Sequence, residues 1–349
     1  MTTGPDLSPH ERMLGIVAGF WLSRAVHAAA RLRLADHIAD GKPLPPAALA
    51  ERSSTHAPSL HRLLRALASA GVFREDEAGR FHQTPLSATL RSDTADTVEA
   101  FVLLELGDAH HRAWGRFLHS LHTGEAAFDT SESVPIWEYF RRHEDARQLL
   151  GRSMAQMTAA LIPGFLAYHP FPSGATVVDV GGGEGRFLTG LLAARQDIRG
   201  VLFELPDVAA AARRALAAAG LESRCEAVGG DFFQAVPEGG DVYLMKWVLH
   251  DWDDAHCRRI LASVRRAMGP GAVLLVLDAV ITPGNESQIG KLVDLDMLVL
   301  AGGRECTEEE FRLLLADAGF AVRRVVPGPV VAVVDAVPAA GHPREGDHG

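Results

Sequence analysis

Cysteine is scarce in this chain of 349 residues, and the three that occur, at positions 225, 257 and 306, lie far apart. Such spacing offers neither a disulfide framework nor a zinc knuckle, so we expect reduced thiols. Long apolar runs are also missing, because the longest, residues 272–277, is far shorter than the about 20 residues that cross a bilayer. Residues 1–10 lack the basic and apolar segments of a secretory signal. We therefore predict a cytoplasmic protein without a membrane span.

The charge balance is acidic, and the composition is that of an ordinary globular protein. A net charge of -10 repels phosphate backbones and argues against nucleic acid as a main partner. With 47% hydrophobic and 22% charged residues, the chain can bury a full core. Its 349 residues exceed the roughly 250–300 at which a single core stops growing, so we expect it to divide into domains.

The first third of the chain has helical periodicity, over residues 11–124. Within it, two short helices at 44–51 and 58–70 precede two short strands at 71–73 and 79–81, a pattern typical of a winged helix. Winged helices often bind DNA. Here the second helix offers only Arg62 and Arg65 as cations, and the wing carries three consecutive acids at 75–77. A structural or dimerising role is favoured.

From residue 176 onward, short β-rich runs alternate with helical ones. Alternation of this kind builds a parallel sheet with helices on both faces. The link between the last two strands is too short for a helical crossover, so the last strand should run antiparallel. The predicted strands are 176–180, 201–204, 225–228, 241–246, 272–278, 321–326 and 330–334, and the predicted helices are 186–194, 208–220, 255–268 and 308–319.

A glycine-rich loop follows the first of these strands. Gly181 and Gly183 lie in it, where glycine lets the backbone pass close to a ligand at a helix N-terminus. A dinucleotide fingerprint would have a third glycine where this chain has Arg186, and a phosphate loop would have Lys followed by Ser or Thr. A nicotinamide cofactor is therefore disfavoured.

Two further strand ends carry side chains suited to adenosine. Glu204 ends the second strand, where a carboxylate can accept hydrogen bonds from both ribose hydroxyls. Asp231 and Phe232 follow the third strand, where an acid can receive an exocyclic amine and a ring can stack on adenine. Each acid alone could be a helix cap or a turn residue. Together, on successive strand ends, they indicate an adenosine site without phosphate recognition.

The chain resembles the class I methyltransferases, and more narrowly the plant caffeate-type O-methyltransferases and their bacterial relatives in antibiotic biosynthesis. The resemblance covers nearly the whole chain and implies an S-adenosylmethionine cofactor and a homodimer joined through the winged N-terminal region. It rests on residues 179–185 (DVGGGEG), 203–206 (FELP), 230–233 (GDFF), 246–252 (KWVLHDW) and 302–305 (GGRE). The cofactor contacts it implies are Gly181, Gly183, Glu204, Asp231, Phe232 and Lys246, with Arg147 on the cofactor's carboxylate.

His250 is the candidate general base, because it lies just past the fourth strand and matches the family motif. A phenol has a pKa of about 10, so a base beside it assists methylation at neutral pH. An imidazole that acts as a base needs its other nitrogen held by an acceptor. The resemblance assigns this role to Asp278 and Glu305; Asp278 is a methylene shorter than the glutamate of many relatives, so its reach is less certain. Asp253 is expected to be a helix N-cap instead.

The substrate is expected between the domains. Trp137, Phe140 and Met297 are apolar candidates for contacting an aromatic ring, although for each of them taken alone core packing is favoured. Met154 and Asp294 fall where the family places substrate contacts.

We expect catalysis without a metal. Small catechol methyltransferases hold Mg²⁺ with clustered Asp and Asn, and no such Asp and Asn cluster follows the fourth and fifth strands. The adjacent His110 and His111 lack partners at zinc spacing.

We therefore predict an α/β enzyme with a Rossmann-like class I methyltransferase sheet and a mostly helical winged-helix dimerisation domain. The expected boundaries are 1–100 for the dimerisation domain, 101–172 for a helical linker and pocket helices, 173–338 for the cofactor domain and 339–349 for a disordered tail. The predicted reaction is methylation of an aromatic hydroxyl in bacterial secondary metabolism. N- or C-methylation, cofactor-assisted hydroxylation or decarboxylation on the same fold, and a winged-helix ligand-sensing regulator remain alternatives.

Overall fold

The computed structural model describes residues 7–38, 41–159, 161–168, 171–328 and 331–339. The chain forms two compact units, one of Met1–His111 with Phe140–Met157 and one of Arg112–Tyr139 with Thr158–Gly349. The predicted disordered tail lies outside the described residues apart from Ala339.

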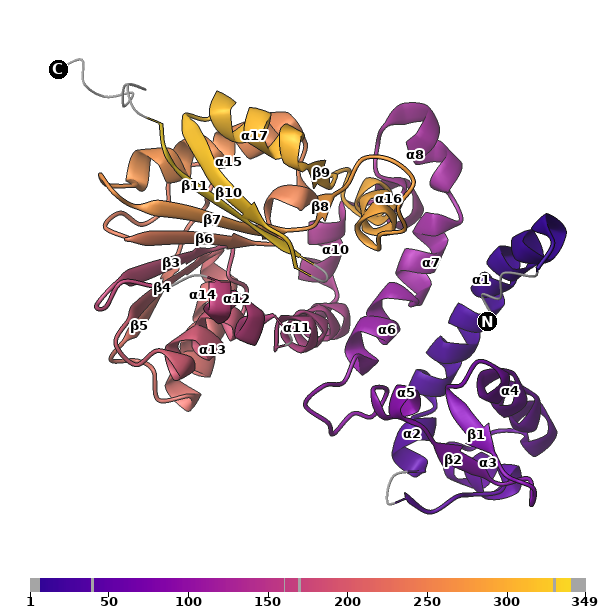
Figure 1. Cartoon of the computed structure of the whole chain (residues 1–349). Helices are drawn as coiled ribbons and strands as arrows, with labels where there is room; N and C mark the ends of the chain where they lie inside the picture. Colours follow the sequence, from indigo (N-terminus) through magenta and orange to yellow (C-terminus); the bar gives the residue numbers. More distant parts are fainter. Residues whose placement is uncertain (1–6, 39–40, 160, 169–170, 329–330, 340–349) are drawn as a thin grey trace. The chain divides into compact units, whose positions relative to one another are not determined.

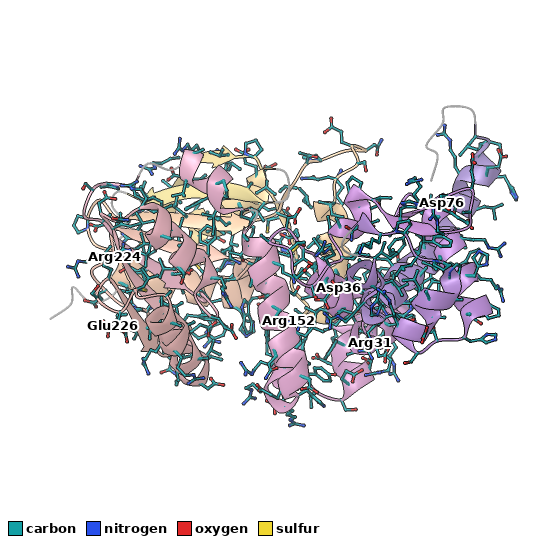
Figure 2. The ribbon with its side chains drawn as sticks, turned by 90° about the horizontal axis from the view of Figure 1, so that it is seen from below. Arg31, Asp36, Asp76, Arg152, Arg224 and Glu226 are labelled. Carbon is teal, nitrogen blue, oxygen red and sulfur yellow. The ribbon has the colours of Figure 1, made fainter. Side chains whose placement is uncertain are left out.

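The first unit contains the winged helix that the sequence predicts. In helix α4, Leu60, Leu64 and Leu67 recur at helical spacing and are buried against Phe73 and Phe81 of the two wing strands. The strands pair antiparallel, each starting two residues later than expected. At the wing turn, Asp76 (labelled in Figure 2) accepts hydrogen bonds from the backbone and guanidinium of Arg80 and pairs with His82. Elements belonging wholly or mainly to this unit are α1 Pro9–Arg31, α2 Leu34–His37, α3 Pro46–Ser53, α4 Ala57–Ser69, β1 Phe73–Glu75, β2 Phe81–Gln83, α5 Pro85–Ala88, α6 Glu99–Glu105, α7 Asp108–Trp114 and α11 Glu144–Ala159.

Helix α1 exposes an apolar face. Ser8 and Glu11 cap its start reciprocally, and only Ala29 and Ala30 near its end are buried. Ile16 and Trp21 are 72% and 67% exposed. By length and composition alone, α1 is long and apolar enough to cross a membrane, and 11% of its apolar stretch is buried. The sequence prediction of no such span did not anticipate this. The result is weak support for a membrane role, because an apolar face of this kind also marks a protein interface.

The second unit is built on a seven-stranded sheet in the order β10-β11-β7-β6-β3-β4-β5. β3 to β7 are mutually parallel, whereas β11 runs antiparallel to both β7 and β10. The predicted antiparallel last strand is confirmed. The strands are β3 Thr176–Val180, β4 Arg199–Glu204, β5 Cys225–Gly229, β6 Val242–Lys246, β7 Val273–Asp278, β10 Phe320–Val326 and β11 Ala332–Pro338, with a small parallel pair formed by β8 Val280–Ile281 and β9 Cys306–Thr307.

Helices cover both faces of this sheet (Figure 1). Successive β3 side chains alternate, so Val178 and Val180 join the core beneath α15 and α17 while Val177 joins the core beneath α12, α13 and α14. The remaining elements of the unit are α8 Phe117–Thr123, α9 Ala127–Glu132, α10 Ile136–Arg142, α12 Ile162–Tyr168, α13 Arg186–Ala194, α14 Pro206–Ala218, the 3₁₀ turn η2 Leu249–Asp251, α15 Asp254–Ala267, α16 Gly290–Leu300 and α17 Glu308–Asp317.

The strand order sets the place of the site. From β3 the chain proceeds outward through β4 and β5, then returns to the other side of β3 with β6 and β7. In open α/β sheets, ligands bind beyond the carboxyl ends of the strands where the order reverses in this way. The loops after β3 and β6 therefore border the expected crevice.

Candidate active site

The glycine loop after β3 is tightly folded. Gly181 and Gly183 both have left-handed backbones, with φ of 72° and 59°. A Cβ at Gly181 would come within 2.8 Å of the Val248 side chain in the loop after β6. The bare backbone of Gly181 thus lets the two loops that border the crevice meet, and helix α13 begins directly afterwards at Arg186.

Glu204 ends β4 beside this loop. One carboxylate oxygen accepts a hydrogen bond of 2.5 Å from the backbone N–H of Leu205. Burial raises the pKa of Glu204, and the hydrogen bond from Leu205 acts in the opposite direction. The backbone N–H of Leu205 thus holds the carboxylate at the strand end. A carboxylate that accepts hydrogen bonds from ribose hydroxyls would need to be held in this way.

Asp231 and Phe232 follow β5 and have different surroundings. Asp231 already accepts hydrogen bonds from the backbone of Phe233 and the side chain of Gln234, as a turn acid does. Phe232 packs edge-on against Phe233, 4.9 Å between ring centroids, and lies near Gly181. The ring therefore borders the glycine loop, while the carboxylate has lone pairs left for a further donor.

Lys246 of β6, which is partly exposed, and the buried Asp179 of β3 act on each other electrostatically. Burial lowers the pKa of Lys246 and raises that of Asp179, and each group partly offsets the shift of the other. Among the described residues, Oδ2 of Asp179 has no hydrogen-bond partner. A buried, unpartnered oxygen at the crevice is available to a cationic or hydrogen-bond-donating ligand. Sequence reasoning quoted Asp179 only as part of the loop motif.

Trp247 has a backbone that bulky residues rarely adopt, with φ of 54°. The Nζ atom of Lys246 lies 3.8 Å from the centroid of its ring, a cation–π contact. Strained residues of this kind concentrate at functional sites. This conformation was not foreseen, because a left-handed tryptophan leaves no signature in a single sequence.

His250 and Glu305 form a direct pair. His250 lies on η2, just past β6, and its Nδ1 is 2.7 Å from Oε1 of Glu305. Their side chains are 11% and 1% exposed. An acceptor on Nδ1 fixes the tautomer that presents Nε2 as the base.

Two more carboxylates surround the imidazole. Oδ1 of Asp251 lies 3.5 Å from Nε2 of His250. Asp278, at the end of β7, is fully buried, and neither of its oxygens has a hydrogen-bond partner within the described part of the chain. Glu305 thus contacts His250 directly, whereas Asp278 affects the imidazole only by electrostatic interaction at a distance. Asp251 had no role predicted from the sequence, although its position directly after the histidine was a visible signal.

The charges of this cluster shift one another. Burial lowers the pKa of His250, yet the three surrounding carboxylates outweigh it and raise the pKa to about 10. Burial raises the pKa of Asp278 to about 8 and that of Asp251 to about 6. An imidazole with this pKa is matched to a phenol, whose pKa is about 10, so proton transfer between them is nearly isoenergetic.

The segment after His250 is fixed by a helix cap. Asp253 accepts a hydrogen bond of 2.8 Å from the backbone of His256 and caps α15, so its predicted N-cap role is confirmed. On the other side of the dyad, Asp294 of α16 accepts a hydrogen bond of 2.9 Å from the backbone N–H of Glu305. One oxygen of this predicted substrate contact is therefore used to hold the glutamate.

The other predicted ligand contacts fall in both units. Met297 lies on α16 and Trp137, 40% exposed, on α10, both in the second unit with the cofactor loops. Phe140, Met154 and Arg147 belong to the first unit. Phe140 is buried, Met154 is partly exposed, and the guanidinium of Arg147 makes a bidentate ion pair with Glu144.

One cavity lies away from this cluster. It measures about 550 Å³ and opens near Pro172, Asp241 and Asp335, at the amino ends of β6 and β7. We place the chemistry at the carboxyl edge instead, because both carboxylates that line the cavity already have partners. Asp335 pairs with the cavity's two arginines, 323 and 324, and Asp241 accepts a hydrogen bond from the backbone N–H of Thr176. Over the described residues, no group of three or more His, Cys, Asp or Glu side chains could hold a metal ion.

Comparisons with known proteins match this geometry. A family model described as an O-methyltransferase domain matches residues 114–321, and one described as an O-methyltransferase dimerisation domain matches residues 14–93. The chain is 41% identical to a phenazine O-methyltransferase of Lysobacter antibioticus, covering 90% of this chain and 92% of that protein. It is 40% identical to a mitomycin biosynthesis 6-O-methyltransferase of Streptomyces lavendulae, covering 94% and 95%.

A solved structure is similar over the same extent. It is that of an O-methyltransferase from neocarzinostatin biosynthesis, in complex with S-adenosylmethionine and 2-hydroxy-5-methyl naphthoic acid. The likeness has a TM-score of 0.77 at 34% identity and covers 90% of this chain and 95% of that one.

Proposed function

This chain belongs to the S-adenosylmethionine-dependent O-methyltransferases of the plant caffeate-type family, and from that premise we propose that it methylates a phenolic hydroxyl of an aromatic small molecule with His250 as the general base. The observation that carries the proposal is the 2.7 Å contact between His250 Nδ1 and Glu305 at the carboxyl edge of the sheet. The resemblance to enzymes of antibiotic biosynthesis supports a secondary metabolite as the acceptor.

The residues at the crevice fit the cofactor. Gly181 and Gly183 would leave room for the nucleoside, Glu204 would accept hydrogen bonds from the ribose hydroxyls, and Phe232, which borders the loop, would stack on the adenine. The unpartnered oxygen of Asp179 suits the positively charged amino group. When bound, S-adenosylmethionine supplies an electrophilic methyl group on a sulfonium.

His250 would hold and remove the proton of the acceptor hydroxyl. Because Glu305 accepts a hydrogen bond from Nδ1–H, Nε2 is the nitrogen left for the substrate. The carboxylates that raise the pKa of His250 also stabilise the imidazolium that forms as the hydroxyl loses its proton. Orientation of the oxygen toward the methyl group contributes up to roughly 7–11 kcal/mol of the barrier reduction.

An aromatic acceptor is supported by the side chains near the dyad and by the relatives. Met297 shares α16 with Asp294, which holds Glu305, so an apolar side chain lies on the helix that supports the catalytic pair. The phenazine and naphthoic acid in the relatives' descriptions are fused aromatic rings of the expected class.

The homodimer follows from the dimerisation model and the open face of α1. Residues 14–93 match that model, and Ile16 and Trp21 lie within it, largely exposed. We infer that a second copy covers this face, so that α1 is an interface helix in a cytoplasmic enzyme and not a membrane span. The acidic wing next to it gives no support to a DNA-binding regulator.

The test is a methyl-transfer assay with labelled cofactor and a panel of phenazine, naphthoate and simple phenol acceptors. We expect release of S-adenosylhomocysteine in stoichiometric amounts with an O-methylated product. Product identification by mass spectrometry separates O- from N- and C-methylation and from hydroxylation or decarboxylation. His250→Asn should lower kcat at least about a hundredfold without weakening cofactor binding; unchanged kcat would remove the assignment of the base.

A further inference from the structure

We propose that Arg304 is a positioning residue that holds Glu305 against His250 by fastening its loop to the N-termini of α15 and α17. The proposal rests on the proposed role of His250 as base. Arg304 itself does not contact the imidazole in any described interaction; it acts through the carboxylate beside it in sequence.

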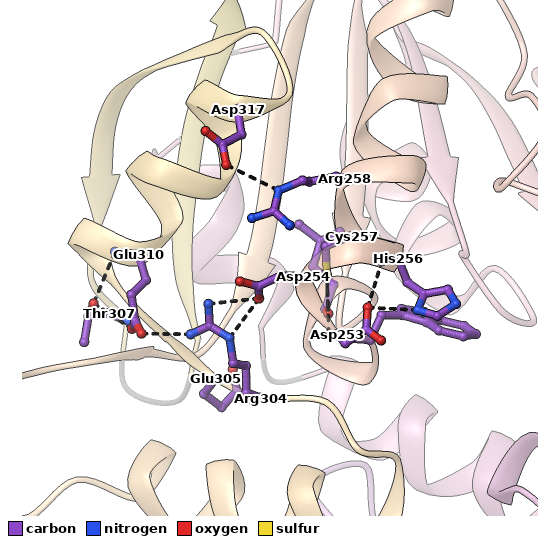
Figure 3. Close-up of polar contacts among 12 residues, drawn as sticks. Asp253, Asp254, His256, Cys257, Arg258, Arg304, Glu305, Thr307, Glu310 and Asp317 are labelled. Atoms are coloured by element: carbon purple, nitrogen blue, oxygen red, sulfur yellow. Dashed lines mark hydrogen bonds and ion pairs between the residues drawn. The ribbon is translucent and has the colours of Figure 1, made fainter. Parts of the chain in front are cut away.

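Arg304 spans two acids on two helices (Figure 3). Its Nε and Nη2 atoms are both 3.0 Å from Oδ1 of Asp254, in the first turn of α15. Its Nη1 atom is 2.9 Å from Oε1 of Glu310, in the first turn of α17. The planar guanidinium can serve two acceptors at fixed angles, which a single ammonium group does less well.

In this clamp, Arg304 and its partner Asp254 lie close in sequence to the two residues of the dyad, Glu305 and His250. Asp254 lies just after His250, on the helix that η2 leads into, and Glu305 directly follows Arg304. The ion pair with Asp254 therefore fixes the backbone that carries His250 relative to the backbone that carries Glu305, and the ion pair with Glu310 fixes the loop of Glu305 to the start of α17. The fixation is relevant because a loss of alignment of about 1 Å can cost about a hundredfold in rate.

The loop needs such a fastening because its own sequence is permissive. Gly302 has a left-handed backbone, φ 72°, and Gly303 follows it. A Cβ at Gly303 would collide with the carbonyl oxygen of His250, so the two segments touch through bare backbone. Glycines make this approach possible but also leave the loop free to move, and Arg304 is the next residue.

Loss of the Arg304 charge and loss of its positioning effect should shift the pKa of His250 in opposite directions. His250 faces the carboxylates of Asp251, Asp278 and Glu305, and the partly exposed Lys246 is a cation that interacts electrostatically with Asp251 and Asp278. Removal of a cation such as Arg304 would raise the pKa of His250. A loosened hydrogen bond from Nδ1–H of His250 to Glu305 would lower that pKa, because the bond favours the imidazolium. The sign of the shift therefore separates the two roles.

Arg258 provides a matched control. It lies on α15 one turn beyond Asp254, and its Nε is 3.3 Å from Oδ2 of Asp317 on α17 (Figure 3). This ion pair joins the same two helices as the clamp, and both of its side chains are about half exposed. Arg258→Gln thus removes an α15–α17 ion pair and leaves the loop of Glu305 intact.

The experiment compares Arg304→Gln, Arg304→Lys and Arg258→Gln in the full-length enzyme. We expect Arg304→Gln to lower kcat by about ten- to a hundredfold, with the KM for S-adenosylmethionine little changed. The pKa of His250, measured by NMR of the imidazole and assigned with His250→Asn, should fall. Arg304→Lys should recover part of the kcat and of the pKa, and Arg258→Gln should match the unaltered enzyme in both.

The proposal is overturned if Arg304→Gln leaves kcat and the His250 pKa unchanged, if that pKa rises, or if Arg258→Gln loses as much activity. Should Arg304→Gln fail to fold, Asp254→Asn removes the α15 arm alone and must give the same directions of change. Full activity of His250→Asn would refute the base and not the clamp, since the NMR titration reports the Glu305 contact without turnover.

Discussion

Oδ1 of Asp294 accepts a hydrogen bond of 2.9 Å from the backbone N–H of Glu305, whose Oε1 lies 2.7 Å from Nδ1 of His250. Helix α16 thus reaches the imidazole through one intervening residue. The rigid placement of Glu305 is shared among a helix side chain, two glycines and an arginine, which explains how a loop carries a group that must be aligned closely.

Glu305→Gln should reduce kcat at least about a hundredfold, because the amide can donate to Nδ1 and so stabilise the wrong tautomer. The same change removes a carboxylate, so the pKa of His250 should fall and the rise of activity with pH should begin at lower pH. Steady-state kinetics between pH 6 and 10 check both effects. An unchanged kcat with intact cofactor binding would contradict the assignment of Glu305.

Asp278→Asn should be mild at neutral pH and stronger in alkali. Because the pKa of Asp278 is raised to about 8, the group is largely protonated at pH 7, where asparagine is close to it in shape and charge. We expect kcat within about tenfold of the unaltered value at pH 7 and a larger difference at pH 9. Equal losses for Asp278→Asn and Glu305→Gln at pH 7 would show that the two carboxylates share one role.

Activity and stability should move in opposite directions in alkali. The folded-state pKa of His250, about 10, exceeds its unfolded value of 6.5. The imidazolium therefore contributes stability that is complete below pH 6.5 and lost as the pH rises through 10. The base form increases over the same range, so kcat should rise by up to about tenfold per pH unit.

Thermal unfolding and kinetics on one buffer series measure both curves. In His250→Asn, the part of the stability loss between pH 6.5 and 10 that comes from the imidazole should disappear. The raised pKa of Asp278 remains in that variant, so its contribution to the loss persists.

Gly303→Ala should destabilise the enzyme by about 1–3 kcal/mol, because the added methyl group would press on the backbone of His250. The control is Gly269→Ala, because a Cβ at Gly269 meets no atom within 4 Å. Gly239→Ala would be a poorer control, because the backbone of Gly239 is left-handed. Chemical denaturation compares the two variants. Equal stability for both would show that the loop of Glu305 can retreat from His250 without loss.

A charge on the open face of α1 should dissociate the dimer. Ile16→Asp with Trp21→Asp places two carboxylates on side chains that are 72% and 67% exposed. Leu313→Asp on α17, 62% exposed, is the matched control in the other unit. Sedimentation velocity should show a monomer for the first variant and a dimer for the second.

Much of the sheet could be read from the sequence because its signals are local. Strand β3 and helix α13 have the predicted bounds, since a β-branched run ends at a glycine loop and an apolar helix follows. The insertion of β11 between β7 and β10 could not be read in this way. That pairing depends on contacts between Val334 and Val276, which are distant in the sequence.

The site was predictable where one residue type at one strand end suffices. His250 and Glu305 were found as a pair on the strength of family motifs, and the structure brings them together. Trp247 and Arg304 were not assigned roles, because a left-handed backbone and a two-helix ion clamp arise only from the packed fold. The exposure of α1 was also hidden, since apolar periodicity alone does not distinguish a buried face from one awaiting a partner.

The position of β11 has a consequence for synthesis. The strand follows both of its neighbours, β7 and β10, in the sequence, so the edge of β7 stays unpaired until residues 332–338 have left the ribosome. During that interval the strand that ends in Asp278 presents an unpaired edge to other nascent chains. A chain that stops before residue 332 would retain every catalytic side chain but would lack the strand that joins β7 to β10 in the sheet.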